Sequence, residues 1–189
     1  MAARYKATCD QCRYRGLLDD VLRSYEFTEQ VTLTIQRVAA WCPRCQGVAW
    51  SEMIPPLADI NLRISEFERR DQTALDAVLP FVSRHSSLAD LVASRLDDLR
   101  RRAAWVRGRQ SPPRCLECGS TEIIPMTSGQ TCSGNPKWTL SPHPNCGGTL
   151  TVLTEPILVL SRLWIRYTPE GNIIAKYEMS PSKGTVPIA

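Results

Sequence analysis

The residues of this chain best suited to chemistry are its eight cysteines, because six of them form three Cys-x-x-Cys pairs. A Cys-x-x-Cys turn aims two thiolates at one metal ion, and two facing turns complete the tetrahedral ligand set that structural zinc prefers. The spacing therefore predicts two zinc ions. The pairs are Cys9/Cys12, Cys42/Cys45 and Cys115/Cys118, and Cys132 and Cys146 follow at wider intervals.

The first predicted zinc site joins two pairs that lie near the N-terminus. Cys9 and Cys12 precede Cys42 and Cys45 by a segment of 29 residues. Such a segment is long enough to carry the strands of a small ribbon between two metal-binding turns. These four cysteines are therefore predicted to hold one zinc ion.

The second predicted site has more candidate ligands than positions. Cys115, Cys118 and Cys146 fill three of its positions, and the fourth falls to Cys132 or His143. Cys132 is favoured because four thiolates are the commoner arrangement where a module has four cysteines. His143 is the alternative, since it stands where a knuckle ordinarily places its first ligand.

The run WTLSPHPNC, residues 138–146, resembles part of a known family. It is similar to the second knuckle of the C-terminal zinc ribbons of type IA DNA topoisomerases, which reads Trp-x-Cys-Ser, two variable residues, then Pro-x-Cys. The family's third cysteine is replaced by Leu140, so another residue must supply that ligand. The resemblance covers about 30 residues and implies a zinc ribbon that binds single-stranded DNA. The matching residues are Trp138, Ser141, Pro144 and Cys146.

Two β-rich modules and a helical middle must position these ligands. Residues 1–57 form the first module, in which 31–41 alternates like a strand and 48–54 is its predicted partner. Residues 58–110 are predicted to be helical, and residues 111–189 to form a second ribbon with a C-terminal hairpin. The predicted fold class is α+β: two small zinc-stabilised β-ribbons flanking a helical middle, with a C-terminal β-hairpin. Because such small cores cannot offset chain entropy, zinc would supply on the order of 10 kcal/mol of folding free energy.

The last helix of the middle segment is rich in arginine. Ser87 and Asp90 resemble a capping box at its start, and Gly108 marks its end. Residues 95–114 carry seven arginines against two aspartates. These arginines form either a phosphate-binding face or a fringe that covers the edges of a core helix. The predicted nucleic-acid-binding residues are Arg95, Arg100, Arg101, Arg102, Arg107, Arg109 and Arg114, with Lys137 and Trp138 from the second ribbon.

Several classes of protein are disfavoured by what the sequence lacks. The chain has two histidines and no His-x-Glu arrangement before a cysteine pair, and it has no Gly-rich phosphate loop, so we expect no enzyme. The N-terminal residues do not resemble a signal peptide, and no apolar run is long enough to cross a bilayer. We expect a cytoplasmic protein without a membrane partner.

Two functions fit these features. The first is a non-enzymatic nucleic-acid-binding accessory protein, since arginine contacts to phosphate and zinc ribbons commonly occur together. The alternative is a structural adaptor or subunit of a multiprotein complex, with other protein subunits as partners for the ribbons and the hairpin.

Overall fold

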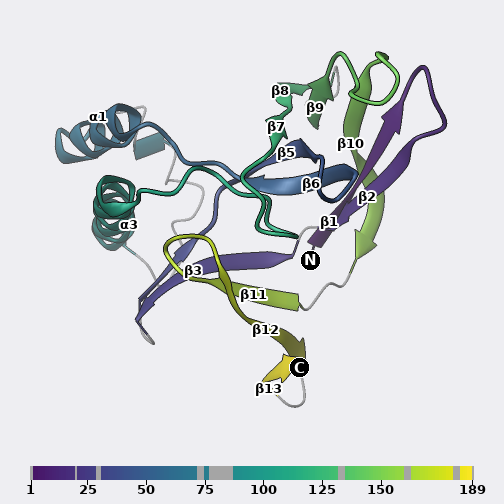
Figure 1. Cartoon of the computed structure of the whole chain (residues 1–189). Coiled ribbons are helices and arrows are strands. Elements are labelled where there is room, and N and C mark those ends of the chain that lie inside the picture. The colour runs from purple at the N-terminus through teal and green to yellow at the C-terminus, as the bar shows by residue number, and fades with distance from the viewer. Residues whose placement is uncertain are drawn as a thin grey trace. The chain divides into compact units, whose positions relative to one another are not determined.

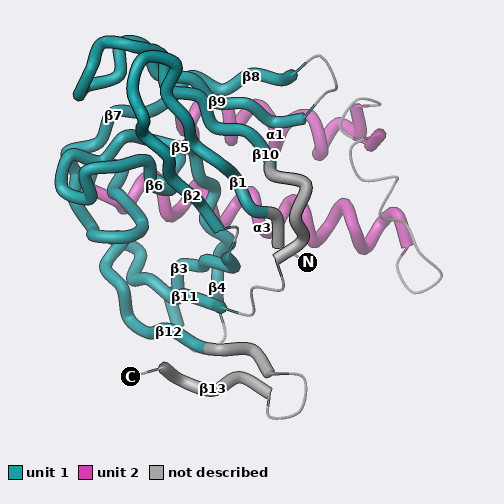
Figure 2. The backbone as a smooth tube through the Cα atoms, turned by 90° about the vertical axis from the view of Figure 1, so that its right-hand side faces the viewer, with its two compact units in different colours: residues 1–53, 111–189 teal, residues 54–110 magenta. Residues whose placement is uncertain are grey.

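The chain forms two compact units that differ from the three predicted domains. One unit contains residues 1–53 and 111–189, and the other contains residues 54–110 (Figure 2). The two cysteine-bearing segments, predicted as separate modules, therefore belong to one unit. The computed structural model describes residues 2–19, 21–28, 31–71, 75–76, 87–131, 135–159, 163–180 and 184–188.

The unit of residues 54–110 is helical, as predicted. Helix α1 spans Leu57–Glu68 and helix α3 spans Leu88–Gly108 (Figure 1). The predicted capping box begins α3, where the hydroxyl of Ser87 accepts a hydrogen bond from the backbone N–H of Asp90 at 3.1 Å. Residues 72–74 and 77–86 of the predicted helical segment lie outside the described residues. The two helices pack through a core of Ile60, Phe67, Leu99 and Ala103.

In the described residues the other unit contains three sheets, the first of which is the five-stranded sheet A. Its strand order is β2-β1-β10-β9-β8, and each described pairing is antiparallel. The first and tenth strands pair along eight residues, although they lie at opposite ends of the sequence. The strands of sheet A are β1 Ala2–Cys9, β2 Arg15–Asp19, β8 Thr127–Gln130, β9 Pro136–Leu140 and β10 Leu150–Val159.

Sheets B and C complete this unit. Sheet B has the order β13-β12-β11-β3-β4 and includes the predicted C-terminal hairpin as the antiparallel pair β11 and β12. Strand β11 also pairs in parallel with β3, which ties the hairpin to the N-terminal segment. The strands of sheet B are β3 Leu22–Thr28, β4 Val31–Thr34, β11 Leu163–Tyr167, β12 Ile173–Ser180 and β13 Gly184–Ile188. Those of sheet C, in the order β6-β5-β7, are β5 Arg37–Cys42, β6 Gly47–Glu52 and β7 Ile124–Pro125.

The strand predicted over residues 31–41 is two strands. Ile35 and Gln36 separate these two strands. Strand β5 pairs with β6, the predicted partner, whereas β4 pairs with β3 in another sheet. Leu33 and Ile35 are buried as the alternation predicts, but the alternation does not continue into β5, where residues 39–42 are all buried. Among the described residues, no helix has the length and apolar character needed to cross a membrane.

Candidate metal centres

The first group of metal-ligating atoms, site 1, contains four cysteines: Cys42, Cys45, Cys115 and Cys118. Cys42 ends β5, and the turn that leads into β6 carries Cys45. The sulfur of Cys42 lies 3.5 Å from that of Cys118, and the sulfur of Cys45 lies 3.8 Å from that of Cys115. Cys42 and Cys115 are buried.

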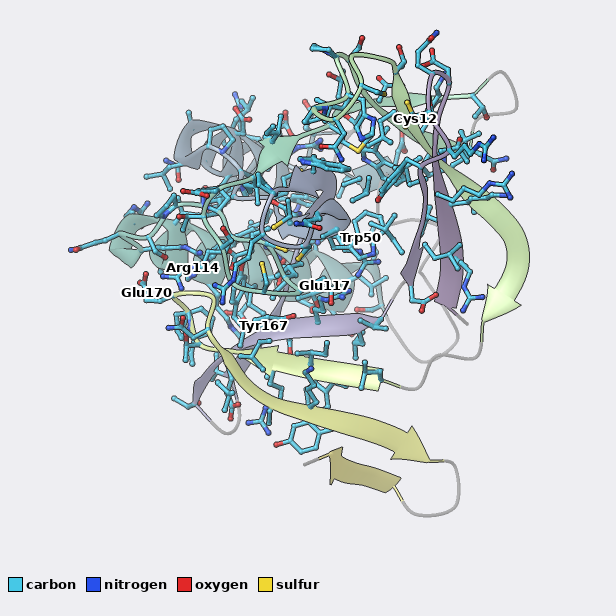
Figure 3. The ribbon with its side chains drawn as sticks, turned by 45° about the vertical axis from the view of Figure 1, so that its right-hand side comes forward. Cys12, Trp50, Arg114, Glu117, Tyr167 and Glu170 are labelled. Atoms are coloured by element: carbon cyan, nitrogen blue, oxygen red, sulfur yellow. The ribbon has the colours of Figure 1, made fainter. Side chains whose placement is uncertain are left out.

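Backbone pairing with β6 places Cys115 against Cys42. The N–H of Glu52 donates to the carbonyl of Arg114 at 2.9 Å, and the N–H of Leu116 donates to the carbonyl of Trp50 at 2.8 Å. The buried Glu52 carboxylate strengthens this junction, because it accepts hydrogen bonds from the N–H of Arg114 at 2.9 Å and from the hydroxyl of Tyr25 at 2.7 Å. The labelled Arg114, Glu117 and Trp50 mark this region in Figure 3.

The second group, site 2, contains Cys9, Cys12, His143 and Cys146. Cys9 is the last residue of β1, and the connection from β9 to β10 carries both His143 and Cys146. The sulfur of Cys146 lies 3.4 Å from that of Cys9 and 3.1 Å from Nδ1 of His143. That same Nδ1 lies 3.7 Å from the sulfur of Cys12. The pairing of β1 with β10 therefore assembles site 2.

The spacing of the ligand atoms fits two tetrahedral zinc ions. Zinc–sulfur bonds of about 2.3 Å place two thiolates about 3.8 Å apart at the corners of a tetrahedron. All ligand atoms within each group lie within 4.8 Å of one another. The seven described cysteines are free, so no disulfide competes for these sulfurs in the described part of the chain. Each group supplies four protein ligands, which is the composition of a closed structural site rather than one with an open position for substrate.

The backbone around the ligands adopts tight turns. The residue after the second ligand has a positive φ in three of them: Gln46 at 53°, Gly119 at 72° and Gly147 at 75°. In two of these turns its N–H returns to the carbonyl of the first ligand, from Gly119 to Cys115 at 2.9 Å and from Gly147 to His143 at 2.8 Å. Because glycine reaches positive φ without a steric penalty, it suits these two positions.

Two thiols of site 1, Cys115 and Cys45, ionise less readily than a free thiol. Burial, with a further contribution from the neighbouring thiols, raises the pKa of the Cys115 thiol to about 12. Burial and the adjacent thiols also raise the pKa of Cys45. A zinc ion shared by four thiolates removes this penalty, because each negative charge then lies beside the metal.

The ring of His143 presents a single nitrogen to site 2. Nδ1 faces the thiols, whereas Nε2 is buried and has no hydrogen-bond partner among the described residues. Tyr14 packs on the ring with 5.5 Å between centroids, which holds its orientation. A neutral imidazole that carries its proton on Nε2 leaves the Nδ1 lone pair for zinc.

The grouping of ligands corrects the predicted one. The sequence predicted Cys9/Cys12 with Cys42/Cys45, but each of these pairs is grouped with ligands from the C-terminal half. His143, the predicted alternative, provides the fourth ligand atom of site 2. The favoured Cys132 lies outside the described residues. The pairing is nested because β1 pairs with β10, whereas in the described part of the chain β5 and β6 pair with each other and with segments that lie between β1 and β10 in the sequence.

The arginines of α3 are largely engaged with carboxylates of their own unit. Arg100 pairs with Glu68 at 2.8 Å, a residue of α1, and Arg101 pairs with Asp97. Arg95 and Arg102 lie 3.6 and 3.7 Å from the same carboxylate, that of Asp98. The charge available to phosphate is therefore smaller than the count of arginines indicates.

Other predicted nucleic-acid contacts are also used within the fold. Arg102 is only 5% exposed, and Arg109 lies with its guanidinium 5.2 Å from the ring centre of Trp105, which is itself buried. Arg114 donates to the side chain of Asn172 at 2.7 Å. Arg107 is exposed at the end of α3.

Trp138 and Lys137 lie on opposite faces of sheet A. Trp138, a predicted nucleic-acid-binding residue, is half-buried and packs edge-on against Tyr5 and Trp50, with ring centroids 5.4 and 5.5 Å away, so its ring is engaged within the fold. Lys137 belongs to the other face, which we call the outer face. Its register partner is Leu153, whose own partner in β1 is Lys6.

The outer face of sheet A carries basic side chains that were not among the predicted nucleic-acid-binding residues. Lys6 and Arg15 are exposed, and Arg15 is the register partner of Thr8. In the described part of the chain no carboxylate pairs with Lys6, Arg15 or Lys137, whereas Arg4 pairs with Asp19 at 2.9 Å. In the sequence, only the period-two pattern of the first strand indicates this face, since Lys6 and Thr8 alternate with Tyr5 and Ala7.

Comparisons with known proteins leave the family open. No protein-family model matches this chain, and the comparisons with curated proteins and with solved structures gave no match either. The function is therefore argued from the geometry of the chain itself.

Proposed function

We propose that this protein binds nucleic acid through the outer face of sheet A, and that its two zinc ions are structural. The observation that carries the proposal is the cross-strand row of Lys6, Leu153 and Lys137, which places two cations on one face of three adjacent strands. Arg15 adds a third cation in the next row. Cations fixed on one rigid face release counterions from a phosphate backbone when they bind it, which favours association.

The hydroxyl groups beside these cations support contact with a phosphate backbone. A second row crosses the sheet from Arg15 through Thr8, Thr151, Thr139 and Thr127, each on a different strand. Threonine hydroxyls and basic side chains donate to phosphate and sugar oxygens, contacts that position a strand without reading its sequence. We therefore expect binding with little base preference.

An enzyme is disfavoured by the same geometry. Sites 1 and 2 each have four protein ligand atoms within 4.8 Å of one another. A catalytic zinc site keeps a position for water or substrate. In this proposal the metal stabilises the ends of the strands and takes no part in a reaction.

Fluorescence anisotropy with labelled single- and double-stranded oligonucleotides at low salt tests the proposal. The variant Lys6→Gln/Lys137→Gln should weaken binding by about tenfold or more and reduce the slope of log affinity against log salt by about two. Lys176→Gln on β12 and Arg100→Gln on α3 are the controls, and each should change affinity less than twofold. Absence of wild-type binding at low salt, or equal losses in the controls, would contradict the proposal.

A protein-docking role is the second candidate. On sheet B, Leu22 is 50% exposed and lies in register with the half-buried Trp164, and Ile173 and Ile174 are also exposed. Exposed apolar side chains in one sheet favour contact with another protein. Light scattering of the purified chain tests this role, since a monomer that elutes without a partner would count against it.

A further inference from the structure

A cavity of about 550 Å³ lies beside site 2, between its first metal-binding turn and the start of β2. Two of the zinc ligands and two arginines contribute to its wall. The labelled Cys12 marks this end of sheet A in Figure 3. The lining residues are Thr8, Cys9, Cys12, Arg13, Tyr14 and Arg15.

The arginines give this cavity its charge. Arg13 and Arg15 are exposed, and no carboxylate pairs with either among the described residues. The acid nearest in sequence, Asp10, keeps its charge but does not line the cavity, and its Oδ1 accepts a hydrogen bond from the N–H of Thr149 at 2.7 Å. A zinc ion with three thiolates and a neutral histidine has a formal charge of about −1. Among the lining residues and the metal site, the two guanidinium groups therefore exceed the negative charge of the metal site by one.

The side chains around the cavity also supply hydrogen-bond donors suited to an oxyanion. Guanidinium groups bind phosphate through two parallel N–H donors, and the hydroxyl of Thr8 stands on the same strand row as Arg15. Tyr14 forms a fixed side of the cavity, since its hydroxyl accepts a hydrogen bond from the N–H of Val48 at 2.8 Å. A fixed aromatic side and several donors in the lining favour a small, strongly charged group.

We propose that this cavity binds a phosphate group. The inference rests on the proposed function for the source of that phosphate, which would be the end of a nucleic-acid strand lying on sheet A. The row of Arg15, Thr8 and Thr151 leads from the cavity across the sheet, so a strand on the outer face would place its terminal phosphate there. A terminal phosphate carries more charge than an internal phosphodiester and matches two guanidinium groups better.

The test compares oligonucleotides of one sequence with a 5′-phosphate, a 3′-phosphate or only hydroxyl ends, together with inorganic phosphate as a competitor. Arg13→Gln is the informative variant, because Arg13 lines the cavity but lies outside the strands of sheet A. The affinity of this variant for either the 5′-phosphorylated or the 3′-phosphorylated oligonucleotide should fall about tenfold, as expected for the loss of a hydrogen bond to a charged group. Its affinity for the hydroxyl-ended oligonucleotide should stay within twofold. Arg63→Gln in α1 is the matched control, and zinc content verifies that each variant is folded.

Each outcome separates the inference from the proposed function. Equal weakening of every oligonucleotide by Arg13→Gln would assign the cavity to an internal phosphodiester. Binding of inorganic phosphate that depends on Arg13, without oligonucleotide binding, would retain the cavity and overturn the proposed function. The inference is overturned, and the proposed function stands, if Arg13→Gln leaves the affinity for every phosphate-bearing ligand unchanged while Lys6→Gln/Lys137→Gln lowers the affinity for the oligonucleotides.

Discussion

The imidazole ring of His143 lies against the indole ring of Trp41, with 4.8 Å between their centroids and an interplanar angle of 78°. His143 is a ligand of site 2, and Trp41 immediately precedes Cys42, a ligand of site 1. Tyr14 packs against both rings at 5.5 Å. The two metal sites therefore share one aromatic core.

The nested arrangement of the ligand pairs can be tested by counting zinc in double variants. Cys9→Ser/Cys146→Ser removes two ligands of site 2 and should lower zinc from about two to about one per chain, because site 1 keeps its four thiolates. Cys9→Ser/Cys42→Ser damages both sites and should lower it towards zero. Zinc is measured by elemental analysis after gel filtration.

The predicted sequential pairing would give the opposite result. With Cys9, Cys12, Cys42 and Cys45 on one ion, Cys9→Ser/Cys42→Ser would cost a single zinc and Cys9→Ser/Cys146→Ser would cost two. The single variants measure any coupling through the shared core. If Cys9→Ser alone also lowers the zinc content of site 1, that loss is subtracted from the loss in the double variants.

Single substitutions test whether His143 or Cys132 is the fourth ligand of site 2. His143→Ala should release one zinc ion, because it removes the Nδ1 atom that faces the sulfurs of Cys12 and Cys146. His143→Cys should retain zinc as a four-thiolate site. Cys132→Ser is the control and should keep both ions; loss of zinc in this variant, with retention in His143→Ala, would restore the fourth ligand favoured from the sequence.

Gly148 lies where the two halves of site 2 touch. A β-carbon at this position would lie 2.5 Å from Cγ of Gln11 and 2.6 Å from Oδ1 of Asp10, so both metal-binding turns would have to move. Gly148→Ala should therefore destabilise the protein by about 1–3 kcal/mol and speed zinc loss to a chelator. Gly108→Ala, with no heavy atom within 4 Å of its added carbon, is the matched control. Equal chelation rates in the two variants would show that the contact is unimportant.

The identity of the ligands was more accessible from the sequence than their grouping. Every described cysteine was selected, because Cys-x-x-Cys turns are local features set by a few residues. Their grouping follows from the register of β1 with β10, in which Cys9 opposes Leu150. Two strands so distant in sequence leave no local signal for their pairing, whereas nearest neighbours in sequence form the default expectation.

The surroundings of the charged residues were also hard to predict, because they depend on residues distant in sequence. The arginine count over residues 95–114 excluded Glu68, which lies on α1 and pairs with Arg100. The row of Lys6 and Lys137 joins strands at opposite ends of the chain, so only the register of sheet A brings these cations together. Helix ends, by contrast, were correctly predicted at Ser87 and Gly108, since capping depends on adjacent residues.

Tyr167 should make the protein less stable as the pH rises above 10. Burial raises its pKa to about 12, and its hydroxyl donates to the carbonyl of Leu116 at 2.9 Å. Between pH 10 and 12 the unfolded chain loses this proton while the folded chain keeps it, so the free energy of unfolding falls by up to about 1.4 kcal/mol per pH unit from this group. At pH 8 the free energy of unfolding of Tyr167→Phe should be about 1 kcal/mol lower than that of the wild type, because the hydrogen bond is lost. Between pH 10 and 11 its free energy of unfolding, measured in urea, should fall less than that of the wild type. An identical decline in both proteins would mean that the hydroxyl ionises without cost in the fold.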